Sequence, residues 1–189
     1  MGKLAADEAA NTVVVEDMLF TFPKDWEVED YDSWYGQSHG AKPLTDKPFN
    51  AKDCDLLALE GNRLWLIEVK DYTYPGKKIN PDLPRDFALK VFHTMARLVA
   101  NAYFGTHHKQ EFCKRALRVD QIKVALAVEV RGNKATLYKA LADLNDLVEA
   151  ECRKMKIARV VIANSQVPST QFSWTQKRLP ATRSNHIDR

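Results

Sequence analysis

The sequence predicts one α/β domain in which a mixed central β-sheet is flanked by helices. Three observations support this: an apolar β-hairpin in the first half, two long amphipathic helical segments, and two buried strands that alternate with those helices. The chain has 189 residues, of which 45% are hydrophobic, so it is long enough to enclose a sizeable core. The order hairpin, helix, strand, helix, strand therefore favours a single α/β sandwich.

The hairpin covers residues 53–70, DCDLLALEGNRLWLIEVK. A Gly-Asn pair between two apolar runs is typical of a two-residue hairpin turn, which places the turn at Gly61 and Asn62. Counting outward from this turn gives the register. It pairs Leu56 with Ile67, Asp55 with Glu68, and Asp53 with Lys70.

Two acids and a lysine fall on one face of this hairpin. Because side chains alternate along a strand, Asp55 shares a face with Glu68 and Lys70 at the end of an apolar stripe. Directly opposed residues have Cβ atoms roughly 4.5 to 5.5 Å apart, and like charges at that spacing destabilise a sheet. A divalent cation such as Mg2+, or Mn2+ in its place, would offset the repulsion, since hard cations bind carboxylate oxygens.

A simpler interpretation of these residues remains open. Asp55 is then a solvated residue at the start of a strand, and Glu68 is neutralised by Lys70 and Asp53 in an ordinary ion-pair cluster at a sheet edge. An E-x-K tripeptide alone is weak support for a metal site, because any exposed strand can carry one. The opposed Asp, the apolar strand around Glu68 and the fixed register favour the metal site.

The order Asp55, hairpin, Glu68-Val69-Lys70 resembles the PD-(D/E)xK superfamily of restriction-endonuclease-like nucleases. The resemblance implies a Mg2+-dependent endonuclease or exonuclease. In it, Asp55, Glu68 and the backbone carbonyl of Val69 bind the metal, and Lys70 helps to activate water. Asp53 competes with Asp55 for the ligand role. The EVKDY segment, the helix after it, KVALAVEV and a late SWT are similar to small uncharacterised bacterial members of this type.

An amphipathic helix is predicted from Arg85 to about Phe104, with Asp86 in its first turn and Gly105 as its stop. Its polar stripe consists of Lys90, Thr94 and Arg97, with His93 beside it. In the resembling nucleases the helix after the E-x-K strand often lends a residue to the site, so Lys90 is a further catalytic candidate. His93 is expected to pack against neighbours rather than to act as a base.

The other predicted elements are a short Ala-rich N-terminal piece and several strands, helices and loops. Strands are expected at residues 12–15, 19–22, 26–31, 121–130 and 158–163, a second helix at 137–155, and loops up to Asn50 and at residues 74–84, where three prolines exclude a regular element. Residues 1–168 are assigned to the nuclease-like domain. Residues 169–189 are expected to form a basic, flexible tail.

Charge is unevenly distributed along the chain. Residues 1–60 carry 5 basic against 13 acidic side chains, whereas residues 153–189 carry 8 basic against 1 acidic. Lys177 and Arg178 of the tail are therefore candidates for contact with a phosphate backbone, although a solvated tail explains them equally well. Lys77 and Lys78 lie just past the motif and are better placed to meet nucleic acid, with solubility as the alternative role.

The three cysteines, Cys54, Cys113 and Cys152, form no C-x-x-C motif and are expected to be free thiols in a reducing compartment. His107 and His108 lack a second ligand pair at zinc-site spacing and are expected near a helix start. The N-terminus shows no apolar signal core, and no run is long enough for a membrane span. The sequence thus predicts a cytoplasmic protein with no membrane partner.

The predicted function is metal-dependent hydrolysis of phosphodiester bonds in nucleic acid, with DNA expected as the substrate ahead of RNA. The alternative is a non-catalytic nucleic-acid-binding or scaffold subunit with a nuclease-like fold. A homodimer or membership of a larger complex is compatible with either function. Metal binding by Asp55 and Glu68 separates the two, because a pure scaffold has no physical need for opposed carboxylates.

Overall fold

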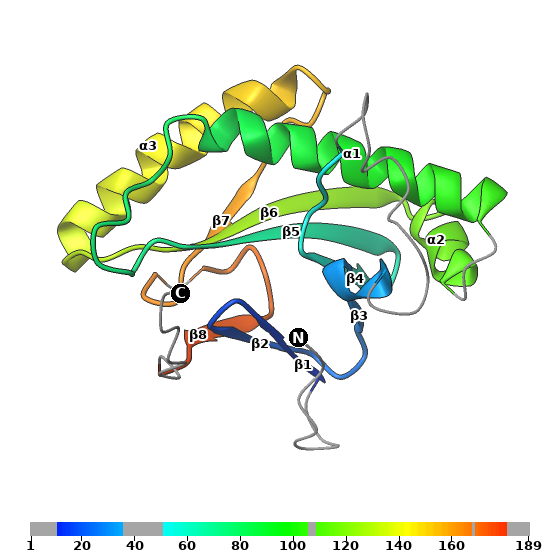
Figure 1. Ribbon diagram of the computed structural model, residues 1–189, viewed down its shortest axis with the longest axis horizontal. Helices are drawn as coiled ribbons and strands as arrows, with labels where there is room; N and C mark the ends of the chain where they lie inside the picture. Colours follow the sequence, from blue (N-terminus) through cyan, green and yellow to red (C-terminus); the bar gives the residue numbers. More distant parts are fainter. Residues whose placement is uncertain (1–10, 36–50, 106–108, 168, 181–189) are drawn as a thin grey trace, which may run out of the picture.

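The computed structural model describes residues 11–35, 51–105, 109–167 and 169–180. Its centre is a five-stranded sheet with the strand order β3-β4-β5-β6-β7. Helices α1 and α3 cover one face of this sheet, and a three-stranded sheet of order β1-β2-β8 covers the other (Figure 1). The predicted α/β class with a mixed sheet is confirmed. The second face is covered by the strands of the small sheet.

The strands of both sheets lie close to the predicted segments in the first half of the chain. They are β1 (Asn11–Val15), β2 (Met18–Phe22), β3 (Glu27–Asp30), β4 (Leu56–Glu60), β5 (Arg63–Asp71), β6 (Gln121–Glu129), β7 (Val161–Ala163) and β8 (Thr175–Arg178). In the central sheet β3, β4 and β5 pair antiparallel, whereas β5, β6 and β7 pair parallel. The sheet is mixed because the chain returns through helices after β5 and β6.

The hairpin register is confirmed from Leu56 opposite Ile67 to Glu60 opposite Arg63. Gly61 begins the turn with φ of +53°, in the left-handed region that glycine adopts without strain. The pairing of β4 with β5 ends at Leu56, so Asp53 and Asp55 lie beyond the paired strand. The predicted strand pairings of Asp55 with Glu68 and of Asp53 with Lys70 therefore do not form.

The helices are α1 (Leu83–Phe104), α2 (Gln110–Ala116) and α3 (Lys134–Arg153), and a short 3-10 helix covers Asp32–Tyr35. Helix α1 begins earlier than predicted because Pro84 occupies its first turn, where a missing N–H breaks no hydrogen bond. It ends before Gly105, where an added Cβ would lie 2.6 Å from the Asn101 carbonyl oxygen. The seven-residue α2 begins two residues after His108, close to the helix start that the sequence predicts.

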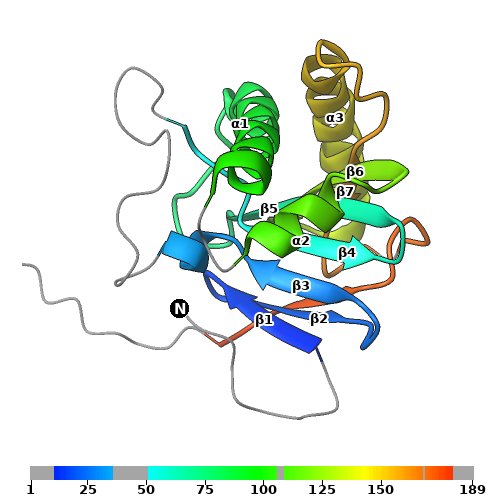
Figure 2. The same ribbon diagram turned by 90° about the vertical axis from the view of Figure 1, so that its right-hand side faces the viewer.

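Each face of the central sheet builds its own hydrophobic core. Leu57, Leu64 and Leu66 pack against the helices, whereas Ala58, Trp65 and Ile67 pack against the small sheet. The alternation of side chains predicted from the hairpin is thus confirmed. In Figure 2, α1 and α3 lie side by side over one face of the central sheet. The face that carries Glu68 is therefore the face under α1.

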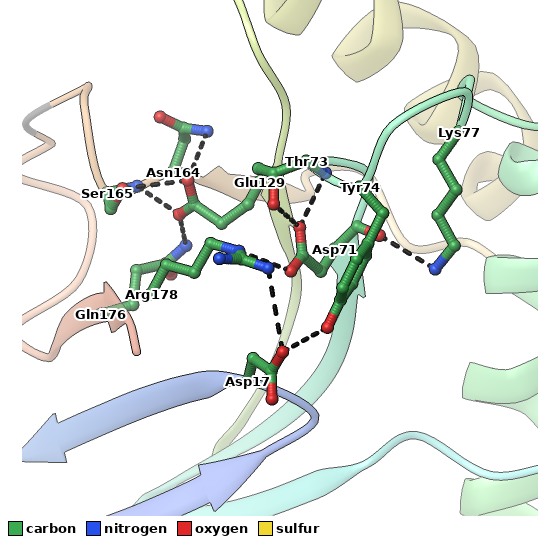
Figure 3. A network of polar contacts seen from close by, with 10 residues as sticks. All are labelled: Asp17, Asp71, Thr73, Tyr74, Lys77, Glu129, Asn164, Ser165, Gln176 and Arg178. Carbon is green, nitrogen blue, oxygen red and sulfur yellow. Dashed lines mark hydrogen bonds and ion pairs between the residues drawn. The ribbon is translucent and has the colours of Figure 1, made fainter. Parts of the chain in front are cut away.

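Strand β8 corrects the prediction of a flexible tail for residues 175–178. It pairs antiparallel with β2, and its side chains reach the central sheet (Figure 3). Arg178 Nε donates to Asp71 Oδ2 at 2.9 Å, and Gln176 Nε2 donates to Glu129 Oε1 at 2.8 Å. Arg178 is thus held in an ion pair, while Lys177 points to solvent. The TQKR sequence has no apolar alternation, so these long-range contacts could not be predicted.

Some predicted features fall outside the described residues: the Ala-rich N-terminal piece, most of the loop up to Asn50, His107 and His108, and the end of the basic tail. Cys54, Cys113 and Cys152 are buried free thiols, as predicted. Within the described ranges, no helix is both long and apolar enough to cross a membrane.

Candidate active site

Three elements bring four predicted site residues together beneath α1. Asp55 directly precedes β4, Glu68 and Lys70 lie on the second half of β5, and Lys90 lies in the second turn of α1. Glu68 and Lys70 face α1 because they share the face of β5 that builds the helix-side core. The helix candidate and the hairpin motif therefore meet, as the resemblance implies.

The Glu68 carboxylate is the centre of this cluster. Its side chain is fully buried, and its Oε1 atom lies 2.6 Å from Lys70 Nζ and 2.6 Å from Lys90 Nζ. Its other oxygen, Oε2, is buried and has no hydrogen-bond partner among the described residues. Buried polar atoms normally have a partner, so an unsatisfied carboxylate oxygen is a position where a cation would bind favourably.

Asp55 is held at the edge of β5. It is 8% exposed, and its Oδ2 accepts a hydrogen bond from the Val69 backbone N–H at 2.7 Å. The N–H and C=O of one strand residue point to the same edge, so the Val69 carbonyl faces the same side. Lys70 Nζ donates to that carbonyl oxygen at 3.0 Å. The Asp55 carboxylate, the Glu68 carboxylate and the Val69 carbonyl are thus neighbours just before the first residue of β4.

The electrostatics of the cluster follow from burial and from the four charges. Burial, followed by the negative charge of Asp55, raises the pKa of Glu68 from 4.5 to about 7. Burial is the largest single effect on the Lys70 and Lys90 ammonium groups and lowers the pKa of each, but the charge and hydrogen bond of Glu68 and the charge of Asp55 together outweigh it, so each pKa is raised. The two lysines therefore stay charged and offset part of the repulsion between the carboxylates.

These contacts bear on the simpler interpretation of the motif. Glu68 is paired with Lys70, as that interpretation proposes, but the cluster is buried rather than at a solvated edge. Asp55 is likewise buried and not a solvated strand-start residue. A buried carboxylate pair is costly to keep without a compensating role.

A cavity of about 400 Å³ opens over the cluster. Its polar lining comprises Glu68 and Lys70 from β5, Lys90 and His93 from α1, and Lys52, Tyr72, Asn80 and Asp86. Asp55 is not one of the lining residues. No sequence pattern indicates Lys52, Tyr72 or Asn80 as site residues, because they reach the cavity through loops whose course depends on the whole fold.

Asp53, the competing ligand candidate, has another partner. Its carboxylate forms an ion pair with Arg97, and both side chains are fully buried. Arg97 Nη2 also donates to the Ala51 carbonyl oxygen at 2.8 Å. Lys90 pairs with Glu68 and Arg97 pairs with Asp53. The two basic residues are seven positions apart, about 10 Å along a helix, so the two acids are held apart. Asp53 is thus engaged in a structural pair and does not join the cluster around Glu68.

The rest of the α1 polar stripe fixes the segment that carries both acids. Thr94 is buried; its Oγ1 accepts from the Cys54 backbone N–H at 2.9 Å and donates to the Lys90 carbonyl oxygen at 2.8 Å. His93 Nδ1 accepts from the Lys52 backbone N–H at 3.2 Å, which agrees with its expected packing role. The stripe therefore positions residues 51–55 against the helix.

The predicted nucleic-acid contacts lie outside this cavity. Lys77 and Lys78 line a separate cavity beyond Tyr72, and Lys77 Nζ donates to the Asp71 carbonyl oxygen at 3.1 Å. Lys177 and Arg178 lie on β8, on the opposite face of the central sheet from α1. None of the four predicted nucleic-acid contacts therefore lines the cavity over Glu68.

The residues present fit a hard divalent cation. Mg2+ is commonly held by one or two carboxylates, with water and substrate phosphate completing its shell. Asp55, Glu68 and the Val69 carbonyl supply that set of oxygen atoms, and Glu68 Oε2 lacks a partner in the described chain. Across the described residues no three His, Cys, Asp or Glu side chains gather into a group that could hold a metal, so a third ligand must come from backbone, water or substrate.

Comparison with known proteins gives one distant similarity. The chain is 28% identical over 167 residues to a cysteine–tRNA ligase from Neisseria meningitidis serogroup A, a match that covers 73% of this chain. The chain spans only 24% of the length of that ligase. No family model matches the chain, and no solved structure matches it. The site itself must therefore carry the functional argument.

The raised pKa of Glu68 predicts a pH dependence for metal binding. A carboxylate must lose its proton to bind a cation, so affinity is full above about pH 7 and falls by about tenfold for each pH unit below it. Titration of Mn2+ into the protein at about pH 6 and about pH 8 measures this. An affinity that stays constant between these two values would contradict the assignment of Glu68 as a ligand.

Proposed function

We propose that this protein is a metal-dependent nuclease that hydrolyses phosphodiester bonds in nucleic acid. The observation that carries the proposal is the convergence of Glu68, Lys70 and Lys90 at one cavity, with the Glu68 carboxylate fully buried and Asp55 held next to it on the Val69 backbone N–H. A fold that needed only stability would gain from apolar residues at positions 68, 70 and 90 together, since replacing whole buried ion pairs by apolar groups is often neutral or stabilising. The resemblance to the PD-(D/E)xK nucleases supports the same function.

Each residue has a role in this proposal. Asp55, Glu68 and the Val69 carbonyl would hold Mg2+ or Mn2+, which lowers the pKa of water and neutralises charge on the transferring phosphate. Lys70 lies against both Glu68 and the Val69 carbonyl, so its ammonium group can position the attacking water and stabilise the hydroxide that forms from it. Lys90 donates to Glu68 and directs a positive charge toward the phosphate.

The test of the substrate must include both DNA and RNA. DNA is the substrate that the resemblance implies. The name of the matched relative refers to tRNA, and because the chain spans about a quarter of that ligase, ligase activity is not carried over. The shared segment nevertheless makes tRNA a rational addition to the substrates.

The experiment that tests the proposal is a cleavage screen with Mg2+ and with Mn2+. It presents single-stranded and double-stranded DNA, single-stranded RNA and tRNA to the purified protein, and the same protein with EDTA is the control. We expect cleavage of at least one substrate that stops when EDTA removes the metal. Cleavage that persists in EDTA, or that is equal for the Glu68→Gln variant, would reject the proposal.

The second candidate is a non-catalytic scaffold subunit, which requires a surface that binds a partner. Helix α1 leaves five apolar side chains exposed: Leu89, Phe92, Val99, Tyr103 and Phe104. The first four follow a three- and four-residue spacing completed by Ala96, which is the pattern by which two like helices pack. A second copy of this chain is the matching partner. Light scattering of the protein and of its Phe92→Glu variant measures their molecular mass. A dimer that forms through α1 would dissociate in the variant.

A further inference from the structure

A second cavity, of about 490 Å³, lies beyond the carboxyl ends of β5 and β6. Its walls are the loop after β5, the residues after β6 and the first turns of α3. The lining residues with polar groups are Tyr72, Tyr74, Lys77, Lys78, Arg131 and Thr136. In open α/β sheets, the crevice outside the carboxyl ends of parallel strands is a common place for ligands.

Tyr72 links this cavity to the proposed active site. It lines both cavities, and its backbone N–H donates to the Glu129 carbonyl oxygen at 2.8 Å, which fixes it at the end of β5. Two positions before it, Lys70 contacts Glu68. A chain molecule whose reactive group lies at Glu68 therefore passes Tyr72 to reach the second cavity.

The charge of the second cavity is one-sided. Three of its lining residues, Lys77, Lys78 and Arg131, are cationic, and no Asp or Glu is among the residues that line it. All three side chains are exposed to solvent. A concave surface lined by one sign of charge attracts ligands of the opposite sign, so the expected occupant is an anion.

The aromatic wall of the cavity is held in place. The Tyr74 ring lies 5.1 Å from Lys77 Nζ and 5.0 Å from the Arg178 guanidinium carbon, and its hydroxyl donates to Asp17 (Figure 3). Tyr72 is half-buried beside it. Ordered tyrosine rings next to cations are the features with which proteins stack nucleobases and contact the phosphates between them.

We infer that this cavity binds an unpaired nucleotide of the nucleic-acid strand whose phosphate lies at Glu68. The inference rests on the proposed function. The base packs on Tyr72, and Lys78 and Arg131 contact the adjoining phosphates. A base in a stacked duplex cannot enter a cavity of this kind unless it is unpaired or extruded, at an unstacking cost. The protein is therefore expected to prefer single-stranded nucleic acid, or a single-stranded extension, to a continuous duplex.

The test measures binding without cleavage. Fluorescence anisotropy follows a fluorescein-labelled DNA oligonucleotide, the same strand annealed to its complement, and the RNA strand of equal sequence, all in EDTA. The variants are Lys78→Ala, Arg131→Ala and the pair together. The control is Lys139→Ala, which removes an exposed lysine that pairs with Asp143 on α3, outside the cavity.

We expect the single strand to bind more tightly than the duplex. The double variant should weaken single-strand binding by about tenfold or more and lower its salt dependence by about one ion for each cation removed, whereas Lys139→Ala should change neither. The RNA arm shows whether the cavity accepts ribose. Equal affinity for strand and duplex, or unchanged binding by the double variant, would overturn the inference.

The two proposals fail in different ways. If wild-type protein cleaves in a metal-dependent manner but the double variant binds the single strand normally, the nuclease function stands and the second cavity is rejected. If the double variant loses single-strand binding while no substrate is cleaved, the cavity stands as a binding site and the catalytic proposal is rejected.

Discussion

The Asp55→Asn variant is expected to lose nuclease activity by about 10³-fold or more, because loss of a metal ligand costs several kcal/mol and about 1.4 kcal/mol corresponds to a tenfold change in rate. The substitution is conservative in structure. Asp55 Oδ2 accepts one hydrogen bond from the Val69 N–H, and an amide oxygen can accept the same bond. It should also lower the pKa of Glu68, because the Asp55 charge is one of the causes that raise it.

The measurement is the initial rate on the best substrate of the cleavage screen, with thermal unfolding as the check on folding. The matched control is Asp143→Asn, which removes an equal charge from the exposed side of α3. Activity of Asp55→Asn at the rate of the parent protein would show that Asp55 is not a ligand.

The Arg97→Ala variant should have the largest effect on stability, with a loss of about 3 to 5 kcal/mol in the free energy of unfolding. Arg97 and Asp53 are both fully buried, so removal of the arginine leaves the Asp53 carboxylate in a low-dielectric region without its partner. The same change removes the hydrogen bond to the Ala51 carbonyl oxygen. Urea unfolding of the variant measures the loss.

A double variant separates the ion pair from the metal site. Asp53→Leu combined with Arg97→Met replaces both charges by apolar groups, which is often neutral or stabilising when a buried pair is removed together. We expect it to recover most of the stability lost by Arg97→Ala and to bind Mn2+ like the parent. If the double variant folds but no longer binds the cation, Asp53 belongs to the metal site after all.

The hairpin and its register could be predicted because they depend on local information. The Gly61-Asn62 turn fixes the pairing, and the period of two then decides which side chains share a face. This was sufficient to bring Asp55, Glu68 and Lys70 together. The helical period identified α1 and its polar stripe in the same way, and Lys90 was a candidate on that stripe.

The errors arose where contacts join segments that are distant in the sequence. The predicted register includes Asp53, but β4 begins only at Leu56. The residues before β4 turn toward Arg97, which lies 44 positions after Asp53 in the chain. Strand β8 likewise depends on its pairing with β2 and on Asp71 and Glu129, which no local pattern in TQKR could indicate. Tertiary structure overrides local propensity at such places.

The Lys90 contact shows the same limit within the candidate site. The sequence placed Lys90 on the correct helix stripe, but its contact with Glu68 depends on how α1 lies across β5. From the sequence, a cation is predicted to offset the repulsion between the Asp55 and Glu68 carboxylates. The structure shows that Lys70 and Lys90 already offset part of this repulsion through Glu68 Oε1, which leaves Glu68 Oε2 for the metal.

The most direct test of the metal site is isothermal titration of Mn2+ into the wild-type protein and into Asp55→Asn, at about pH 8, where Glu68 has lost its proton. A single-stranded oligonucleotide with an uncleavable backbone is present in a second series, so that its phosphates can complete the ligand shell. We predict that the wild-type protein binds the cation in at least one series and that Asp55→Asn does not. Equal binding by both proteins, or binding by neither in either series, would contradict a metal site at Asp55 and Glu68.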